Sequence, residues 1–177
     1  ALRWVDTLAA ERINVWYTAP TAVRMLMKAG PALVVGRAFP ALRFIASVGE
    51  PLNAEAVRWG MATFGRPIHD TWWQTETGAI MIANAAGELK PGAMGRPVPG
   101  VAAHVVRRAG EPKGTVEIIE APDTVGELAL ETGWPSMFRA YLGQPERYRA
   151  CFAGPLYLSG DLVRRDADGF FWFVGRS

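Results

Sequence analysis

Apolar and polar positions in the first part of the chain predict helices and strands in turn. Residues 2–12 carry apolar side chains at helical spacing, and the apolar run 14–18 that follows is typical of a short strand. A second helix is expected over 20–28, because Pro20 suits its first turn and Gly30 ends the segment. The order is therefore helix, strand, helix.

The next segments repeat this alternation. The run 42–48 is typical of a buried strand, and Asn53 is placed to cap a helix over 54–64 that ends at Gly65. A further short strand is expected at 66–69. Strands that alternate with helices in this way predict a parallel sheet with helices on its faces.

The pattern changes after about residue 84, where a stretch rich in Gly, Pro and Ala begins. Short strands are then expected at 101–107, 115–120 and 127–131, with turn signals such as Gly110-Glu111-Pro112 between them and one helix at 144–152. We therefore predict the α/β fold class in two parts. A partial parallel sheet with flanking helices occupies 1–84, and a small, mostly antiparallel β-barrel subdomain occupies 85–177.

The composition is typical of a globular protein. Half of the 177 residues are hydrophobic, and the chain contains seven Trp and eight Phe, which is ample for a core. The net charge of +2 is small and the basic residues are scattered, so we expect no nucleic-acid partner. No apolar run reaches the ~20 residues that span a bilayer, so no membrane partner is expected either.

Cys151 is the only cysteine, which excludes an internal disulfide and fits a reducing compartment such as the cytoplasm. Because its neighbours Tyr148 and Phe152 are aromatic, we expect a buried structural thiol and not a nucleophile. His69 and His104 lie far apart in the sequence and show no metal-ligand spacing.

Candidate chemistry is concentrated in the run Asp70 to Gly78, which reads Asp-Thr-Trp-Trp-Gln-Thr-Glu-Thr-Gly. The run follows the strand at 66–69, so its side chains are expected on the loop that leaves the sheet, where open α/β sheets bind ligands. Hydroxyl groups and a carboxylate suit a phosphate and its Mg²⁺, which prefers hard oxygen ligands. From the residues alone, a buried aromatic pair followed by a capped helix is the alternative.

A second candidate lies in the hairpin near the end of the chain. If Arg165 pairs with Phe170 across a four-residue loop, Asp161 lies opposite Val174 and close to Arg176. A carboxylate accepts hydrogen bonds from both hydroxyls of a ribose, and a guanidinium donates to ribose or phosphate oxygens. The alternative is a surface ion pair worth at most about 1 kcal/mol.

These motifs occur in the order found in one known family. The run Trp72 to Gly78, the tripeptide Gly49-Glu50-Pro51 and the hairpin carboxylate Asp161 resemble the acyl-adenylate-forming enzymes, and within them the acetyl-CoA synthetase branch. Gly126-Glu127-Leu128-Ala129-Leu130, Trp134 to Arg139 and Tyr148 extend the resemblance over essentially the whole chain. It corresponds to the later half of the family's large N-terminal domain.

The resemblance implies three sets of site residues: a nucleotide-binding set, a pair with catalytic roles and an acyl pocket. The nucleotide set is Gly49, Glu50 and Pro51 at the adenine, Asp161 and Arg176 at the ribose, Thr75 and Thr71 at the α-phosphate, Asp70 and Gln74 shaping the loop, and Trp72. Thr75 and Glu76 carry the catalytic roles, with Glu76 on Mg²⁺, and Val48 and Trp73 border the acyl pocket. A large indole there favours acetate or propionate over longer acids.

The implied reaction needs ATP, Mg²⁺ and CoA. Acetate attacks the α-phosphorus to give acetyl-AMP, and the CoA sulfur then displaces AMP, so catalysis rests on positioning and charge stabilisation. No Gly/Ser/Thr-rich phosphate loop ending in Lys occurs, and the chain starts without Met and stops where the family continues into a mobile C-terminal domain. We therefore expect a fragment that is inactive alone, whose partners are the missing N-terminal region and C-terminal domain of the same protein.

Two other functions stay open. An adenylating enzyme for propionate, a longer acyl chain or an amino acid is one, and the Trp72-Trp73 pair speaks against the larger substrates. The other is a nucleotide-binding module without chemistry, which is disfavoured because Thr75, Glu76 and Asp161 are all present.

Overall fold

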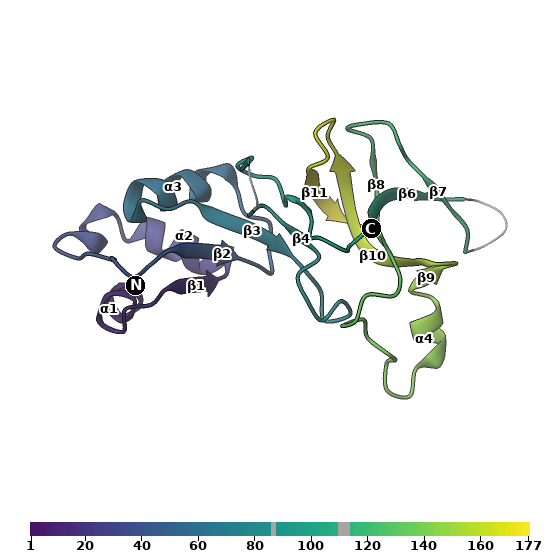
Figure 1. Cartoon of the computed structure of the whole chain (residues 1–177), viewed down its shortest axis with the longest axis horizontal. Helices are drawn as coiled ribbons and strands as arrows, with labels where there is room; N and C mark the ends of the chain where they lie inside the picture. Colours follow the sequence, from purple (N-terminus) through teal and green to yellow (C-terminus); the bar gives the residue numbers. More distant parts are fainter. Residues whose placement is uncertain (86–87, 110–113) are drawn as a thin grey trace. The chain divides into compact units, whose positions relative to one another are not determined.

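The computed structural model of the chain describes residues 1–85, 88–109 and 114–177. The turn expected at Gly110-Glu111-Pro112 lies outside these residues. Two compact units make up the structure (Figure 1): the first contains Ala1–Trp72 and Ala83–Met94, and the second contains Trp73–Ile82 and Gly95–Ser177. The prediction of subdomains at 1–84 and 85–177 stays a prediction.

The first unit is a parallel sheet with helices. Its elements are α1 (Leu2–Ala10), β1 (Val15–Thr18), α2 (Pro20–Lys28), the 3₁₀ helix η1 (Pro31–Val34), β2 (Phe44–Ser47), α3 (Ala54–Phe64) and β3 (Ile68–Trp72). Strands β1, β2 and β3 are neighbours in that order and both pairs are parallel. The predicted alternation and the predicted parallel sheet are confirmed.

Local signals explain the helix ends in this unit. Pro20 occupies the first turn of α2. The Asn53 side chain accepts a hydrogen bond from the backbone N–H of Ala56 at 3.0 Å, which caps α3. Gly65 ends α3 in the left-handed conformation, with φ of 65°, which costs glycine little.

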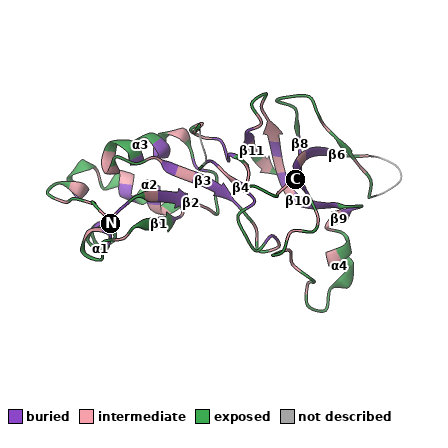
Figure 2. Ribbon diagram, in the orientation of Figure 1, coloured by how far each residue is buried: buried purple, intermediate pink, exposed green. Residues whose placement is uncertain are grey.

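The core of the first unit lies between the sheet and its helices. Val23, Leu26, Ile45 and Ile68 are fully buried in one apolar cluster. Figure 2 shows buried positions along β2 and β3. Helix α3 comes close to β3 at Gly60, where a Cβ atom would stand 2.6 Å from the Ile68 side chain. That approach requires glycine.

The end of strand β3 differs from the sequence prediction. The sequence predicted a strand at 66–69 with Asp70, Thr71 and Trp72 on the loop beyond it, but β3 runs from Ile68 through Trp72. The backbone of Asp70 continues the ladder because its carbonyl accepts a hydrogen bond from the N–H of Asn84 at 2.9 Å. Thr and Trp also have high β propensity, so the polar character of the run misled the prediction.

The second unit contains an antiparallel sheet together with other short elements. Its elements are β5 (Arg96–Pro97), β6 (Ala103–Arg108), β7 (Val116–Ile118), β8 (Val125–Glu131), α4 (Pro145–Arg149), β9 (Phe152–Ala153), β10 (Leu156–Arg165) and β11 (Phe171–Arg176), while β4 (Ile82–Ala83) spans the division between the units. The strand order is β11-β10-β8-β6-β7, and β9 pairs with β10. The sheet curls around buried apolar side chains such as Val106, Ala129 and Leu158, which confirms the predicted barrel-like class (Figure 1).

Two local predictions in this unit were wrong in detail. The helix expected at 144–152 is the shorter α4, because Phe152 enters β9 and pairs with Tyr157. In the hairpin, Arg165 pairs with Phe171, and a β-bulge lies between Leu162 and Val163. Because the ladder is irregular, the register of the two strands cannot be counted from the loop alone.

No helix in the described part of the chain is both long and apolar enough to cross a membrane.

Candidate functional site

The predicted site residues fall into two groups, one in each compact unit. Val48, Gly49, Glu50, Pro51, Asp70, Thr71 and Trp72 belong to the first unit, and Trp73, Gln74, Thr75, Glu76, Asp161 and Arg176 belong to the second. The structure brings Asp70 and Thr71 into contact in the first unit, and Gln74, Asp161 and Arg176 in the second.

In the first unit, Asp70 is the middle residue of β3 and is buried. Burial raises the pKa of the Asp70 carboxyl to about 8, although the backbone N–H groups of Leu52 and Thr71 donate hydrogen bonds to it. The group is therefore largely protonated at neutral pH. It acts as a neutral hydrogen-bonding group that shapes the loop after β2.

Asp70 belongs to a row of polar residues across three strands. Thr18, Ser47 and Asp70 are register partners in β1, β2 and β3, so their side chains point to the same face of the sheet. The hydroxyls of Thr18 and Ser47 are buried and have no hydrogen-bond partner in the described structure. These two hydroxyls lie at the carboxyl end of the sheet, which is the end where open α/β sheets bind ligands.

Thr71 is tied into the sheet. Its hydroxyl donates to the Ser47 carbonyl at 2.8 Å and lies 2.8 Å from the Tyr17 hydroxyl, while its backbone N–H donates to Asp70 Oδ1 at 3.0 Å. A hydroxyl has one proton, so Tyr17 is the donor to Thr71. The Thr71 hydroxyl would have to break its hydrogen bond to the Ser47 carbonyl before it could donate to a phosphate.

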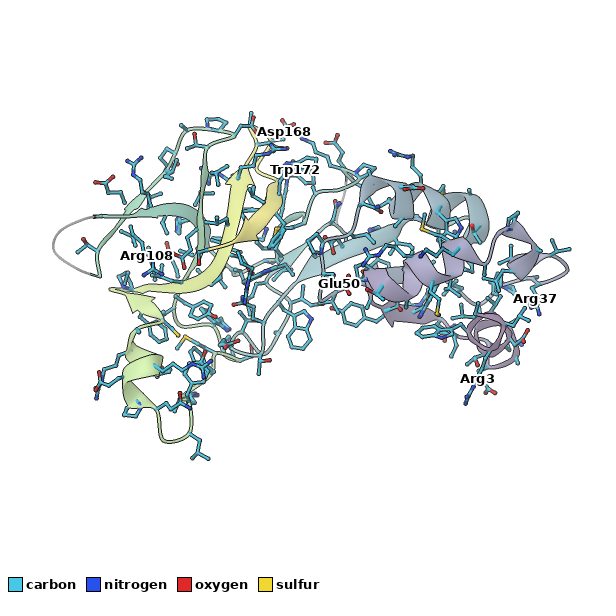
Figure 3. The ribbon with its side chains drawn as sticks, turned by 180° about the vertical axis from the view of Figure 1, so that it is seen from behind. Arg3, Arg37, Glu50, Arg108, Asp168 and Trp172 are labelled. Carbon is cyan, nitrogen blue, oxygen red and sulfur yellow. The ribbon has the colours of Figure 1, made fainter. Side chains whose placement is uncertain are left out.

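Glu50 follows β2 and contacts α2 (Figure 3). The Thr21 hydroxyl donates to Glu50 Oε1 at 2.5 Å, and the Arg24 guanidinium forms an ion pair with the same carboxylate. These two partners hold the pKa of Glu50 below its usual value. Gly49 before it has φ of 95°, a conformation that glycine supplies at low cost. Sequence reasoning did not foresee Thr21 and Arg24.

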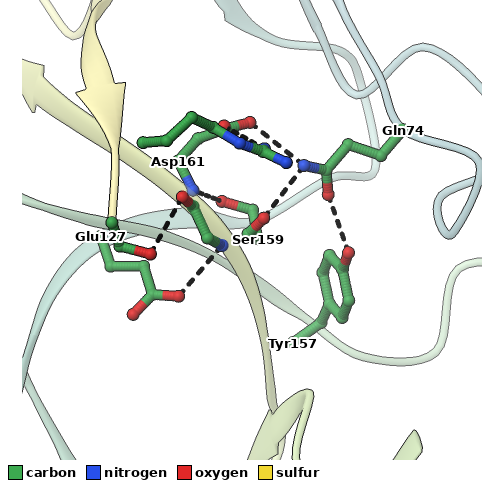
Figure 4. Close-up of polar contacts among 8 residues, drawn as sticks. Gln74, Glu127, Tyr157, Ser159 and Asp161 are labelled. Carbon is green, nitrogen blue, oxygen red and sulfur yellow. Dashed lines mark hydrogen bonds and ion pairs between the residues drawn. The ribbon is translucent and has the colours of Figure 1, made fainter. Parts of the chain in front are cut away.

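In the second unit, Gln74 connects the motif to the hairpin (Figure 4). Its Nε2 donates to Asp161 Oδ2 at 3.1 Å and to the Ser159 carbonyl at 3.0 Å. Its Oε1 accepts from the Tyr157 hydroxyl at 2.7 Å. Burial, together with the negative charge of Glu76, raises the pKa of Tyr157, which therefore stays a proton donor. Gln74 and Asp161 are therefore joined by a hydrogen bond although they lie 87 positions apart in the sequence.

Asp161 and Arg176 form the predicted hairpin pair, with a corrected register. Asp161 is a direct register partner of Arg176 and not of Val174. Arg176 Nη1 lies 2.5 Å from Asp161 Oδ1, and this contact raises the pKa of Arg176. The carboxylate is buried while the guanidinium is largely exposed, so the arginine can reach a ligand.

Glu127 supports the turn before Asp161 and was not foreseen. Its Oε1 accepts from the N–H of Gly160 at 3.0 Å, and Arg108 binds both of its oxygens, at 3.0 and 3.2 Å. Gly160 has φ of 74°, so the chain bends sharply between Ser159 and Asp161. The available signal was an acidic residue inside the apolar strand β8, since a buried carboxylate needs partners.

The Glu76 carboxylate has a tyrosine partner. The Tyr141 hydroxyl donates to Glu76 Oε1 at 2.5 Å, and burial together with Glu76 raises the pKa of Tyr141. Cys151 Sγ lies 3.9 Å from the same hydroxyl. Cys151 is half-buried and not buried as predicted, because it borders a cavity of about 270 Å³ that Glu76, Tyr141 and Arg176 also line.

The donor set fits a cation that a nucleotide brings with it. No group of three His, Cys, Asp or Glu in the described ranges is arranged to hold a metal ion. Mg²⁺ is commonly bound by one or two carboxylates together with substrate phosphates and water. Glu76 is half-buried at the cavity, and Thr75 is exposed beside it without a side-chain hydrogen bond in the described structure, so these residues suit that arrangement.

Open α/β sheets bind ligands, nucleotides among them, at the carboxyl ends of their strands, and a guanidinium suits phosphate oxygens. The chain belongs to the AMP-binding enzyme family, which residues 1–142 match.

Curated relatives cover nearly the whole chain. The acetyl-coenzyme A synthetase of Bacillus subtilis (strain 168) is 46% identical over 175 residues, which are 98% of this chain and 29% of that relative. The acetyl-coenzyme A synthetases of Rubrobacter xylanophilus and Methylobacillus flagellatus are 41% and 42% identical, each over 98% of this chain and 27% of the relative. The chain thus spans less than a third of their length.

Proposed function

We propose that this chain is part of an ATP-dependent acetyl-CoA synthetase. The observation that carries the proposal is the buried Asp161 carboxylate, which is held by Gln74 and paired with Arg176 in the unit that also contains Glu76. The names of the relatives support acetate as the acid. The reaction forms acetyl-AMP and pyrophosphate from acetate and ATP, and the CoA sulfur then displaces AMP.

Each side chain has a role that its geometry supports. Asp161 accepts the ribose hydroxyls, and Arg176 donates to ribose or phosphate oxygens. Thr75 donates its unpaired hydroxyl to the α-phosphate. Glu76 contacts Mg²⁺, which when bound neutralises the charge of the phosphates. Gly49 to Pro51 meet the adenine.

The acyl pocket is proposed at Val48 and Trp73. Trp73 is 38% exposed in this structure. A large wall shortens the pocket and excludes longer acids by steric cost, which supports acetate or propionate over longer chains.

Other parts of the protein complete the site in this proposal. The chain spans 27–29% of its relatives, and no phosphate loop ending in Lys occurs in it. We propose that regions on either side of this chain supply that loop and the mobile C-terminal domain, and that the isolated chain does not catalyse acetate-dependent pyrophosphate exchange. We place the reaction in the cytoplasm, where ATP and CoA are available.

The test is binding of a nonhydrolysable acetyl-adenylate mimic by the full-length protein. Asp161→Ala should weaken binding at least about 10-fold, because hydrogen bonds to a charged group contribute about 1.5–3 kcal/mol. Asp168→Ala is the matched control, because Asp168 lies exposed at the hairpin tip (Figure 3). Equal binding by wild type and Asp161→Ala would remove the ribose role. Binding without acetate-dependent exchange by the full-length protein would favour a module without chemistry.

A further inference from the structure

Tyr141 stands out among the residues that border the cavity because it contacts Glu76 directly. The two residues lie 65 positions apart, and the Tyr141 hydroxyl donates to Glu76 Oε1 at 2.5 Å. Only one of the two carboxylate oxygens is engaged by this bond. The contact therefore orients the carboxylate without covering its other oxygen.

The segment before Tyr141 also holds the backbone around Glu76. The N–H of Phe138 donates to the Glu76 carbonyl at 2.9 Å. The Thr77 carbonyl accepts from Trp134 Nε1 at 2.9 Å and from the Ser136 hydroxyl at 2.7 Å. The turn at Glu76 is thus held by three bonds from residues 134–138, and its side chain by a fourth from Tyr141.

Tyr141 is itself fixed in place. The Arg147 guanidinium lies over its ring at 4.1 Å from the centroid, and the Phe138 ring packs against it at 5.2 Å and 62°. A ring held on two sides keeps its hydroxyl in one position, which is what an orienting hydrogen bond requires. Arg147 and Tyr141 both line the cavity.

We propose that Tyr141 is a positioning residue for Glu76: its hydroxyl holds Oε1 and aims the carboxylate at a divalent cation carried by the nucleotide phosphates. The inference rests on the proposed function, in which Glu76 contacts Mg²⁺. Outer hydrogen-bond partners of a metal-binding carboxylate typically change metal affinity or activity 10- to 100-fold when they are removed.

The test measures cation binding directly. Mn²⁺ is titrated into the full-length protein with a nonhydrolysable ATP analogue, and free Mn²⁺ is followed by electron paramagnetic resonance. Tyr141→Phe should weaken Mn²⁺ binding about 10-fold and leave the KM for acetate unchanged. Tyr148→Phe is the matched control, because Tyr148 packs on the same Phe138 ring at 5.0 Å and its hydroxyl has no hydrogen bond in the described structure.

Two further variants separate the possible failures. Glu76→Gln should weaken Mn²⁺ binding at least as much as Tyr141→Phe; wild-type affinity in Glu76→Gln would overturn the metal role of Glu76 and the inference with it. Weakened binding in Glu76→Gln with unchanged or tighter binding in Tyr141→Phe would overturn the inference alone. If Tyr141→Phe does not fold, Glu76→Asp, which withdraws the carboxylate from the tyrosine but keeps its charge, should show the same loss, and wild-type affinity there would contradict the proposal.

Discussion

Asp161 and Arg176 are direct register partners across β10 and β11, and their side chains meet at 2.5 Å. The pair joins a buried carboxylate to an exposed guanidinium. Such a pair is a poor source of stability, because burial of the carboxylate costs free energy that the exposed partner only partly returns. The proposed ribose role accounts for this geometry, because a ribose needs an acceptor and a donor side by side.

The first prediction concerns the support of that pair. Tyr157→Phe removes the hydroxyl that donates to Gln74 Oε1, and Gln74 in turn donates to Asp161. One lost hydrogen bond is worth about 1 kcal/mol, so affinity for the acetyl-adenylate mimic should fall about 5-fold, less than in Asp161→Ala. Calorimetric titration of the full-length protein measures it. Unchanged affinity would mean that Asp161 keeps its position without the Tyr157 contact.

Sequence reasoning was most successful where the signals are local. The cap of α3 at Asn53 and its end at Gly65 were predicted to the residue, because both depend on one side chain or one backbone conformation. The end of β3 was missed because pairing with neighbouring backbone decides it. The hairpin register was missed because a bulge at Leu162 leaves no clear mark in the sequence.

The candidate site shows the same division. Asp161 and Arg176 were predicted as neighbours, since a hairpin is a local structure. Tyr141 was missed because its contact with Glu76 joins residues 65 positions apart. Tyr157 was missed because its contact with Gln74 joins residues 83 positions apart.

The second prediction concerns substrate size. Trp73→Gly in the full-length protein should lower kcat/KM for acetate and raise it for four- and five-carbon acids, because the indole wall is removed. Each methylene accommodated in an apolar pocket contributes about 1–3 kcal/mol, so the preference should shift at least about 10-fold. Rates of acid-dependent pyrophosphate exchange over a series of acids provide the measurement. An equal fall in kcat/KM for all acids in the variant would show that Trp73 lies outside the acyl pocket.

The third prediction concerns pH. The pKa of Asp70 rises from 3.8 to about 8 on folding, so the folded chain binds more protons than the unfolded chain between these values. Stability should therefore fall as pH rises through this window, with a contribution from this group of at most about 1.4 kcal/mol per pH unit. Below pH 3.8 and above about 8 the group contributes no slope.

Asp70→Asn tests this assignment, because asparagine keeps an acceptor for the Thr71 N–H but does not titrate. Urea unfolding of the purified chain at several pH values should show a flatter pH dependence in the variant, and a smaller loss of stability near pH 8. Parallel curves for wild type and variant would show that the carboxyl ionises normally in the fold.

The fourth prediction concerns the turn that carries Glu76. Gly78 has φ of 65°, and a Cβ atom there would lie 2.4 Å from the Ser136 carbonyl oxygen. Gly78→Ala must therefore push away the segment whose Trp134 and Ser136 side chains bind the Thr77 carbonyl. Gly154→Ala is a matched control, since Gly154 has φ of 57° but nothing within 4 Å of the added Cβ.

Both alanine variants suffer the strain of a positive φ, about 1–2 kcal/mol, and only Gly78→Ala adds the clash. The free energy of unfolding should therefore fall by a larger amount in Gly78→Ala. Mn²⁺ binding in the presence of the ATP analogue should weaken in Gly78→Ala alone, because displacement of residues 134–138 also moves Tyr141 away from Glu76. Equal effects of the two substitutions on stability and on cation binding would show that the close approach of Ser136 does not position this turn.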